Sequence, residues 1–151
     1  MNTDEINKYI SLLSWHKSEE ENQLAIKKLS GIEEKLFPSL VLPSFDKSVW
    51  ENSALVLKNI GYPKIKNIIP EIIVWLQDQN WPGFDIIIDL LGTVEESVLI
   101  SNVENILILA NNDGDDMWIC GIKRLLEKHG LMKKDLLKKE IIEILNTPDW
   151  C

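Results

Sequence analysis

Four of the six tryptophans are each followed by a glycine that closes an apolar stretch, and this recurrence constrains the fold more than any other feature of the sequence. The pairs are Trp15 and Gly31, Trp50 and Gly61, Trp81 and Gly92, and Trp118 and Gly130. Successive tryptophans of these pairs lie 31 to 37 residues apart. A second amphipathic stretch follows each of the last three glycines, over 64–79, 94–111 and 133–146. A repeat of this length that carries two helices is typical of α-solenoids of the HEAT or armadillo kind.

The apolar residues recur with the period of a helix throughout the chain. Leucine and isoleucine each occur 21 times, whereas valine occurs seven times and threonine three times, a bias that favours helices over strands. The clearest helical stripe, with spacings of three and four, consists of Ile65, Ile68, Ile69, Ile72, Ile73 and Leu76. No segment sustains a period of two. We therefore predict an all-α fold, a short right-handed solenoid of about seven to eight helices in HEAT- or armadillo-like pairs.

The 151 residues suffice for one domain with its own core. We expect residues 1–37 to form an N-terminal cap, because this first unit matches the repeat least well. Residues 38–47 contain two prolines and are predicted to be the longest linker. Residues 48–151 would then form three helix pairs within the same single domain.

Capping residues predict where several of these helices begin and end. Four capping boxes combine Ser or Thr with Glu three residues later, namely Ser18/Glu21, Ser48/Glu51, Thr93/Glu96 and Ser101/Glu104. The glycines at 31, 61, 92 and 130 are expected in the left-handed conformation that ends a helix. Pro82 is placed in the first turn of a helix after Asn80. Pro70 either opens its helix after a short preliminary turn or kinks a longer helix.

Two stretches of the chain resemble an uncharacterised, mainly bacterial family, domain of unknown function 5071. The first is Ile-Pro-Glu-Ile-Ile-Val-Trp-Leu-Gln-Asp-Gln-Asn-Trp-Pro at 69–82, and the second is Asn-Asn-Asp-Gly-Asp-Asp-Met-Trp at 111–118. Gly83 and Phe84 depart from the small aliphatic residues expected there. The resemblance covers about 60–128 and implies a small HEAT-like helical domain. It implies no reaction.

The charge and the cysteines narrow the classes of partner and compartment. The net charge of −8 and the single arginine, Arg124, supply little for binding phosphates, so nucleic acid is an unlikely partner. The same charge favours a basic protein. Cys120 and Cys151 are too few and too distant for a disulfide framework, and Cys151 is expected to fray. No signal peptide or membrane span is evident, so we expect a cytoplasmic, reduced protein without membrane contact.

No combination of residues has the spacing of a catalytic or metal site. The turn at 113–116 fails as an EF-hand because Met117 and Arg124 occupy ligand positions, and its aspartates are expected to cap a helix. His16 and His129 are far apart, and His129 suits the last turn of a helix. Cys120 is expected in the core or an interface. Phosphate-binding loops and nucleophile motifs are lacking. We therefore expect no enzymatic activity, no cofactor and no metal.

The turns 43–48, 77–82 and 111–117 would lie along one edge of a solenoid and form an acidic rim with two indoles. The candidate binding residues on this rim are Asp78, Asn80, Trp81, Asp113, Asp115, Asp116 and Trp118. Such a rim suits a basic protein segment, because tryptophan is a favoured binding anchor. Three well-capped helix starts would produce the same sequence pattern, so both interpretations stand at this point.

We expect a non-catalytic protein-interaction module for a basic partner, of which an immunity protein that blocks a toxin is one version. A second hypothesis is a HEAT-like enzyme that acts on nucleic acid, such as a base-excision glycosylase, which the low pI disfavours. A third is a structural subunit that forms homodimers. The apolar face for this purpose would be Ile141, Ile142, Ile144 and Leu145 of the last helix.

Overall fold

The computed structural model describes all residues, 1–151, and contains helices but no strands, which confirms the all-α prediction. Eight α-helices and five short 3-10 helices, η1–η5, account for about two-thirds of the chain. The elements are α1 (Thr3–Ser11), α2 (Glu19–Leu29), η1 (Glu34–Leu40), η2 (Lys47–Val49), α3 (Trp50–Ile60), η3 (Lys66–Ile68), α4 (Ile69–Ile73), η4 (Val74–Gln77), α5 (Phe84–Leu91), α6 (Glu96–Asn112), α7 (Asp116–Lys128), η5 (Leu131–Lys133) and α8 (Lys139–Leu145). None of them combines the length and apolar composition needed to cross a membrane.

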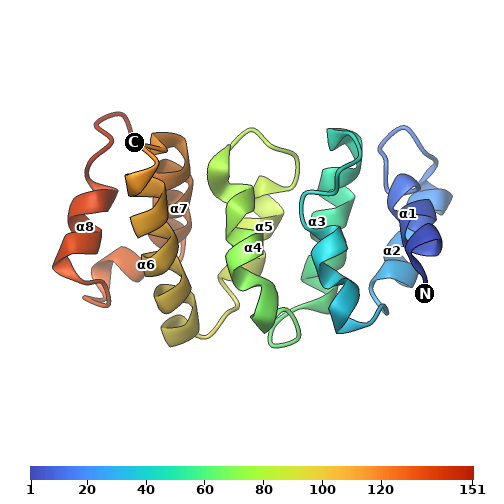
Figure 1. Cartoon of the computed structure of the whole chain (residues 1–151), viewed down its shortest axis with the longest axis horizontal. Coiled ribbons are helices and arrows are strands. Elements are labelled where there is room, and N and C mark those ends of the chain that lie inside the picture. The colour runs from blue at the N-terminus through green and yellow to red at the C-terminus, as the bar shows by residue number, and fades with distance from the viewer.

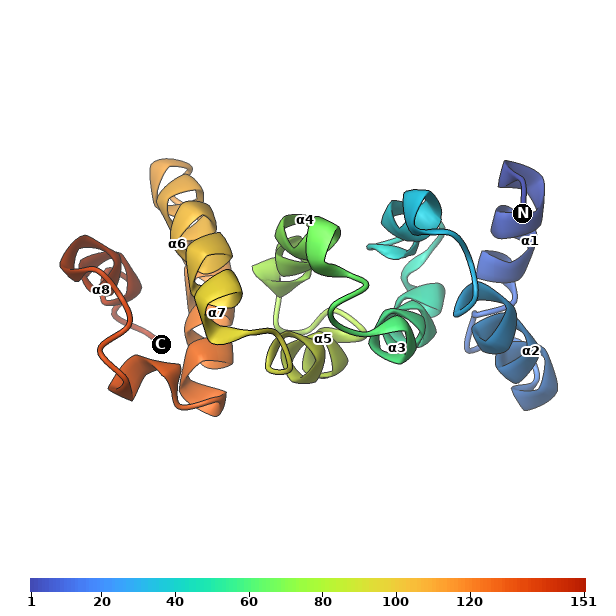
Figure 2. The same cartoon turned by 90° about the horizontal axis from the view of Figure 1, so that it is seen from below.

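The helices stand side by side in chain order along the long axis of the molecule (Figure 1). A view rotated by 90° about the horizontal axis shows two rows of helices, with α2, α3 and α5 in one row and α1, α4 and α6 in the other (Figure 2). Contacts run both along and across these rows. Helix α3 packs against α2, α5 and η1, whereas α6 packs against α4, α7 and α8.

One hydrophobic core of 40 buried residues extends from Ile6 in α1 to Leu145 in α8. All six members of the stripe predicted between Ile65 and Leu76 belong to it. Hydrogen bonds join the first unit to the second. The side chain of Asn52 in α3 donates to the carbonyl of Leu13 at 2.8 Å, and the hydroxyls of Ser14 and Ser48 share a buried hydrogen bond. The first helix pair therefore shares the core and the polar contacts of the rest of the chain.

The single helix predicted over 64–79 is wrong in detail, because three short elements replace it. Residues 66–68 form η3, α4 follows from Ile69 to Ile73, and η4 continues to Gln77. Pro70 is the second residue of α4, where its missing N–H breaks no helical hydrogen bond. Of the two roles considered for Pro70, the structure shows the opening of a helix after a short preliminary turn. The helix expected over 94–111 agrees closely with α6.

One of the four predicted capping boxes forms. Ser18 and Glu21 exchange side-chain hydrogen bonds at the start of α2. Ser48 instead lies within η2, Thr93 precedes the N-cap of α6, and Ser101 lies in the interior of α6. The spacing of Ser or Thr and Glu alone therefore does not fix where these helices begin. Likewise, α5 begins two residues after Pro82, which lies in the preceding turn.

Two of the four glycines predicted at helix ends have a positive φ, but only Gly130 has the left-handed helical conformation, because Gly61 has a ψ of 172°. Gly61 has a φ of 72° and Gly130 a φ of 68°. Gly31 is absent from the residues with positive φ, and Gly92 has a φ of −66°, so the prediction is wrong for these two as well. Helix α5 ends instead with the N–H of Gly92 donating to the carbonyl of Ile88. The backbone conformation at Gly92 is therefore open to any residue, and glycine is needed there for packing.

Candidate functional site

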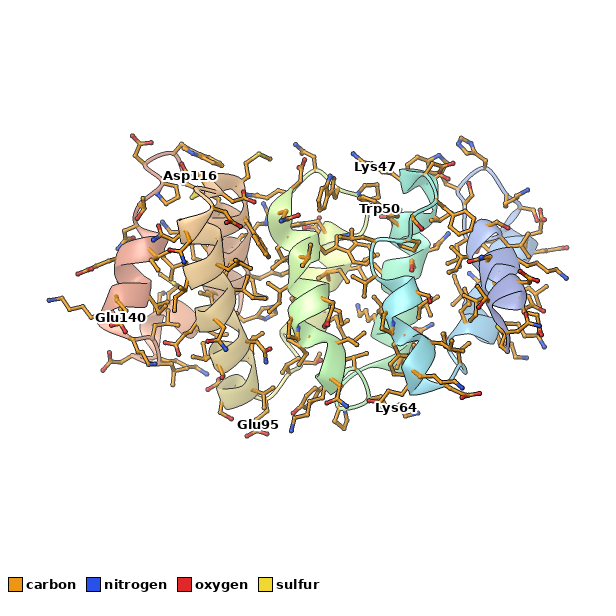
Figure 3. The ribbon with its side chains drawn as sticks, in the orientation of Figure 1. Lys47, Trp50, Lys64, Glu95, Asp116 and Glu140 are labelled. Carbon is orange, nitrogen blue, oxygen red and sulfur yellow. A yellow bond between two sulfur atoms is a disulfide. The ribbon has the colours of Figure 1, made fainter.

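The predicted rim turns lie at one edge of the molecule. In Figure 3, Asp116 lies at the same edge as Lys47 and Trp50, and Glu95 and Lys64 lie at the opposite edge. The turn between η4 and α5 reaches the first of these edges as well, as does the C-terminal segment (Figure 1). We call residues 78–83, 113–117 and 146–151 the acidic edge.

A hollow of about 260 Å³ opens on the acidic edge where its three segments meet. Asp78 and Asn80, both candidate binding residues, line it together with Gln79. Met117 at the start of α7 and Trp150 complete the lining, and their residues are 48% and 58% exposed. Sequence reasoning missed both of them. Exposed apolar side chains of this size beside polar groups are typical of binding surfaces.

The aspartates of the acidic edge differ in whether their carboxylates accept hydrogen bonds from their own chain. Asp113, Asp116 and Asp149 are exposed and form no ion pair or side-chain hydrogen bond. Asp115 caps α7 by accepting a hydrogen bond from the N–H of Trp118 at 3.1 Å. This agrees with the prediction that aspartates of this turn cap a helix. Asp78 accepts the N–H of Asn80 at 2.8 Å and holds the turn that lines the hollow. The three unpaired carboxylates are therefore available to a partner, and so is the second carboxylate oxygen of Asp78, which accepts no hydrogen bond.

Trp118 does not lie on the surface, and the expectation that it flanks the rim is wrong. Its residue is 5% exposed, and its indole N–H donates to the carbonyl of Ile73 at 3.0 Å. This carbonyl belongs to the last residue of α4, at the junction where η4 begins. Trp118 is thus a core residue that joins α7 to α4.

Trp81 is half-buried in a cluster of three indoles. Its ring meets that of Trp50 edge-on with centroids 5.3 Å apart, and Trp75 lies on the other side of Trp50 at 6.3 Å. The Lys47 ammonium lies 5.7 Å from the Trp50 centroid and 6.0 Å from that of Trp81. Because a cation of the same chain already faces these rings, Trp81 contributes to the site mainly by supporting the turn 78–83.

A disulfide joins Cys120 to Cys151, so the expectation of reduced thiols and of a frayed end is wrong, whereas Cys120 is buried as expected. The two Cα atoms lie 5.8 Å apart. The residues after α8 return toward α7 (Figure 1), and the ammonium of Lys123 donates to the carbonyl of Cys151 at 2.8 Å. Sequence separation alone suggested that the cysteines were too distant, but the turn back from α8 brings them together. Trp150 is held on the acidic edge by this arrangement.

Asp46, in the turn before η2, accepts hydrogen bonds from its own chain. The hydroxyl and then the backbone N–H of Ser48 donate to its carboxylate, and these hydrogen bonds lower the pKa of Asp46 below its ordinary value. Ser48 also shares a 2.7 Å hydrogen bond with the buried hydroxyl of Ser14. Asp46 therefore caps η2 and supports the junction with the first helix pair.

The single arginine is occupied by groups of its own chain. The Arg124 guanidinium lies 3.7 Å from Asp85 and 3.4 Å from Gln79, and it covers the ring of Phe84 at 5.8 Å. Its contact with Gln79 fixes one wall of the hollow. No group of three or more His, Cys, Asp or Glu side chains is arranged to hold a metal ion.

A larger hollow of about 650 Å³ lies at the opposite edge, beside the start of α6. Three glutamates line it, but each already has a partner within the chain. Glu95 accepts from Ser97, Glu96 pairs with Lys134, and Glu104 accepts the backbone N–H of Lys138. The carboxylates of this hollow are therefore already paired, whereas three of those at the acidic edge are free, and we take the acidic edge as the candidate site.

Fewer residues of the apolar face predicted for self-association are exposed in the structure than the sequence predicted. Ile141 and Leu145 are buried in the core, where α8 packs against α6. Ile144 is partly buried and Ile142 is exposed. Dimer formation through this helix stays a prediction that rests on Ile142 and its surroundings.

A family model described as Domain of unknown function (DUF5071) matches residues 46–150. The match includes α3 through α8 and every candidate residue of the acidic edge. It extends beyond the stretch 60–128 in which the resemblance was noticed. No curated protein and no solved structure matches the chain.

Proposed function

Because the chain belongs to the family described as Domain of unknown function (DUF5071), whose name assigns no activity, we propose its function from its surface. The proposal is a non-catalytic helical-repeat module that binds a protein with a basic surface at the acidic edge. A fold alone fixes no function, so the proposal rests on the site.

The proposal includes the architecture expected from the repeat, a short right-handed solenoid of HEAT- or armadillo-like pairs. Two rows of helices in chain order and the single continuous core support it (Figure 2). The division into a cap over 1–37, a linker over 38–47 and three pairs over 48–151 belongs to the same proposal. Stacked helix pairs present long edges, and such edges are common binding surfaces.

One observation carries the functional proposal: the hollow at the acidic edge combines exposed Trp150 and Met117 with the unpaired carboxylates of Asp113 and Asp116 nearby. Aromatic and methionine side chains supply contact area that loses water on binding. The carboxylates attract and orient a basic partner, as does the net charge of −8. Both contributions are present at this edge.

An immunity protein that blocks a basic toxin is the most specific version of this proposal. The small size and acidic charge support it, as does a site whose charges are free before binding. This version predicts a stoichiometric complex with a basic enzyme encoded beside this protein, and inhibition of that enzyme. A cytoplasmic location, as expected from the sequence, is part of this version.

The first experiment places a photo-crosslinking amino acid at Met117 and, as a control, at Leu24, an exposed apolar position on α2. Each variant is irradiated in a lysate of its native host, and the products are identified by mass spectrometry. We expect one basic protein to be crosslinked at position 117 and not at position 24. A partner crosslinked only at position 24 would move the site away from the acidic edge.

The second experiment measures the affinity of that partner by titration calorimetry. The double variant Asp113→Asn, Asp116→Asn removes two free charges and spares the helix cap at Asp115. We expect it to weaken binding roughly five- to tenfold, with a smaller loss in high salt. The matched control, Glu20→Gln with Glu71→Gln, makes the same change in net charge away from the edge. Equal losses in the two variants would show that charge alone, and not this edge, directs binding.

A further inference from the structure

The disulfide and the hollow of the acidic edge are linked through one face of α7. Met117 and Cys120 are three residues apart, so their side chains lie one turn apart on the same face of the helix. Cys151 is bonded to Cys120, and Trp150 is its neighbour in the chain. The disulfide therefore sets Trp150 beside Met117, where the two side chains line the hollow together.

Few other contacts hold the segment that carries Trp150. Residues 146–151 form no helix, and Pro148 is their only buried residue. The Lys123 ammonium donates to the carbonyl of Cys151, but both groups are at the surface. Asn146 and Thr147 are held by hydrogen bonds to the carbonyls at the end of α8, and Pro148 is buried. Residues 149–151 are the segment that only the disulfide and this exposed hydrogen bond hold, and one such bond does not offset the conformational entropy that three residues lose on ordering. Without the disulfide, the segment would therefore leave the hollow.

We propose that the Cys120–Cys151 disulfide regulates binding at the acidic edge by placing Trp150 in the hollow. This inference rests on the proposed function and adds its regulation. The oxidised chain binds a basic segment more tightly than the reduced chain, in which the hollow lacks one wall. The state of two thiols thus decides whether the binding surface is complete.

The chemistry of the hollow indicates what it takes from the partner. The Trp150 indole attracts a cation to its face, and the Asp78 carboxylate lies in the same lining. Arginine suits both, because its planar guanidinium stacks on aromatic rings and pairs with carboxylates. The Met117 thioether adds an apolar contact for the stem of that side chain. The occupant is an arginine-bearing segment of a protein partner.

The redox step is thiol–disulfide exchange with a low-molecular-weight disulfide as the oxidant. The thiolate of exposed Cys151 attacks the oxidant and releases one thiol, which leaves a mixed disulfide on Cys151. The Cys120 thiolate then attacks the Cys151 sulfur and releases the second thiol. Two protein thiols become one disulfide, and the oxidant disulfide becomes two thiols that carry both protons. A dithiol reductant reverses these steps and itself becomes a disulfide.

The test uses a fluorescein-labelled peptide of twelve alternating arginine and leucine residues as the probe, measured by fluorescence anisotropy. We expect the oxidised chain to bind roughly fivefold more tightly than the chain reduced with a dithiol. Cys151→Ser and Trp150→Ala should each match the reduced chain. Trp15→Ala is the matched control, because Trp15 is 55% exposed at the other end of the molecule, and it should bind as the oxidised chain does.

Hydrogen exchange of residues 146–150 and 78–83, followed by mass spectrometry, tests the inference without any partner. We expect faster exchange in both segments after reduction. Unchanged exchange, or two free thiols in protein purified under air, would overturn the inference and leave the proposed function standing. If instead the Asp113→Asn, Asp116→Asn variant binds the probe as tightly as the oxidised chain, the proposed function fails. Equal affinity of the oxidised and reduced chains, with binding lost in that variant, overturns the redox control alone.

Discussion

The imidazole ring of His129 occupies the space in which a side chain at position 92 would lie. A Cβ atom on Gly92 would come within 2.1 Å of the His129 ring carbon Cε1. The His129 Nε2 lies 3.0 Å from the carbonyl oxygen of Ile88, and because a carbonyl only accepts, Nε2 donates. The ring, which follows the end of α7, thereby provides a hydrogen-bond donor to the last turn of α5. His129 serves a helix terminus, as expected, but the terminus belongs to a neighbouring helix.

Gly92→Ala is expected to lower the free energy of unfolding by about 1–3 kcal/mol, because the added methyl displaces the His129 ring and its hydrogen bond. Unfolding in urea, followed by circular dichroism, measures the change. Gly31→Ala is the matched control, since a Cβ there meets only a carbonyl at 3.8 Å. A variant at position 92 as stable as the one at position 31 would show that the ring moves aside freely.

Trp118→Phe is expected to destabilise the fold by about 1–3 kcal/mol, because it removes a buried hydrogen bond from the indole to the carbonyl of Ile73. The ring volume that is lost adds to this cost. Chemical denaturation again provides the measurement. Trp150→Phe makes the same change at an exposed indole and should leave the unfolding midpoint unaltered. Equal midpoints for the two variants would contradict the structural role assigned to Trp118.

Reduction of the Cys120–Cys151 disulfide is expected to lower the free energy of unfolding by about 2–4 kcal/mol, because the bond closes a loop across a sequence separation of 31 residues. Urea titrations with and without a dithiol reductant give the difference. Cys151→Ser should be as unstable as the reduced wild type and should not respond to the reductant. A response of that variant would reveal an effect of the reductant unrelated to this bond.

The ion pair between Asp89 and Lys128 makes stability depend on pH in the acid range. The Lys128 ammonium donates to Asp89 at 2.9 Å, and this hydrogen bond lowers the pKa of Asp89 below its ordinary value of 3.8. A lowered pKa in the folded state means that the stabilisation is complete above the ordinary value. It disappears as the pH falls through the lowered value.

We therefore expect wild type to lose more stability than Asp89→Asn as the pH falls from about 5 to about 2.5. The difference should stay below about 1 kcal/mol, because both side chains are about half exposed. Denaturation at several pH values measures it. Lys128→Gln removes the same pair from the other side, so its pH dependence should equal that of Asp89→Asn.

The sequence predicted those elements that depend on local pattern. The helix α6 lies within two residues of its predicted start and one of its predicted end, because its buried side chains follow a helical period over 17 residues. The stripe from Ile65 to Leu76 is buried as predicted, although its helix is not continuous. Burial repeats along the chain, and a repeat can be recognised without knowing the neighbouring elements.

Features that depend on distant partners could not be predicted in this way. Gly92 lacks a side chain because the His129 ring, 37 residues later in the chain, fills the space beside it. No local sequence pattern shows that these two residues are neighbours. Trp118 begins an amphipathic run beside acidic residues, so it resembles a surface anchor until Ile73 is placed next to it. Ser48 matches a capping box, but Asp46 and Ser14 take up its hydroxyl instead.

The candidate site was predicted in part. Asp78 and Asn80 line the hollow, and Asp113 and Asp116 are free on the same edge. Trp150 was missed, because its place follows from the turn back after α8 and from the disulfide. One signal was present in the sequence, since Trp150 precedes Cys151.

The hydrogen bond from the Trp118 indole to the carbonyl of Ile73 joins α7 to α4, two helices that α5 and α6 separate in the chain. It satisfies the end of α4 with a donor that α4 itself cannot supply. A duplicated pair inserted between them would separate this donor from its acceptor unless it carried both a tryptophan and a matching open carbonyl. Growth of such a protein by duplication would therefore conserve the two groups together, and a lengthened chain that keeps only one of them should lose its regular spacing at the joint.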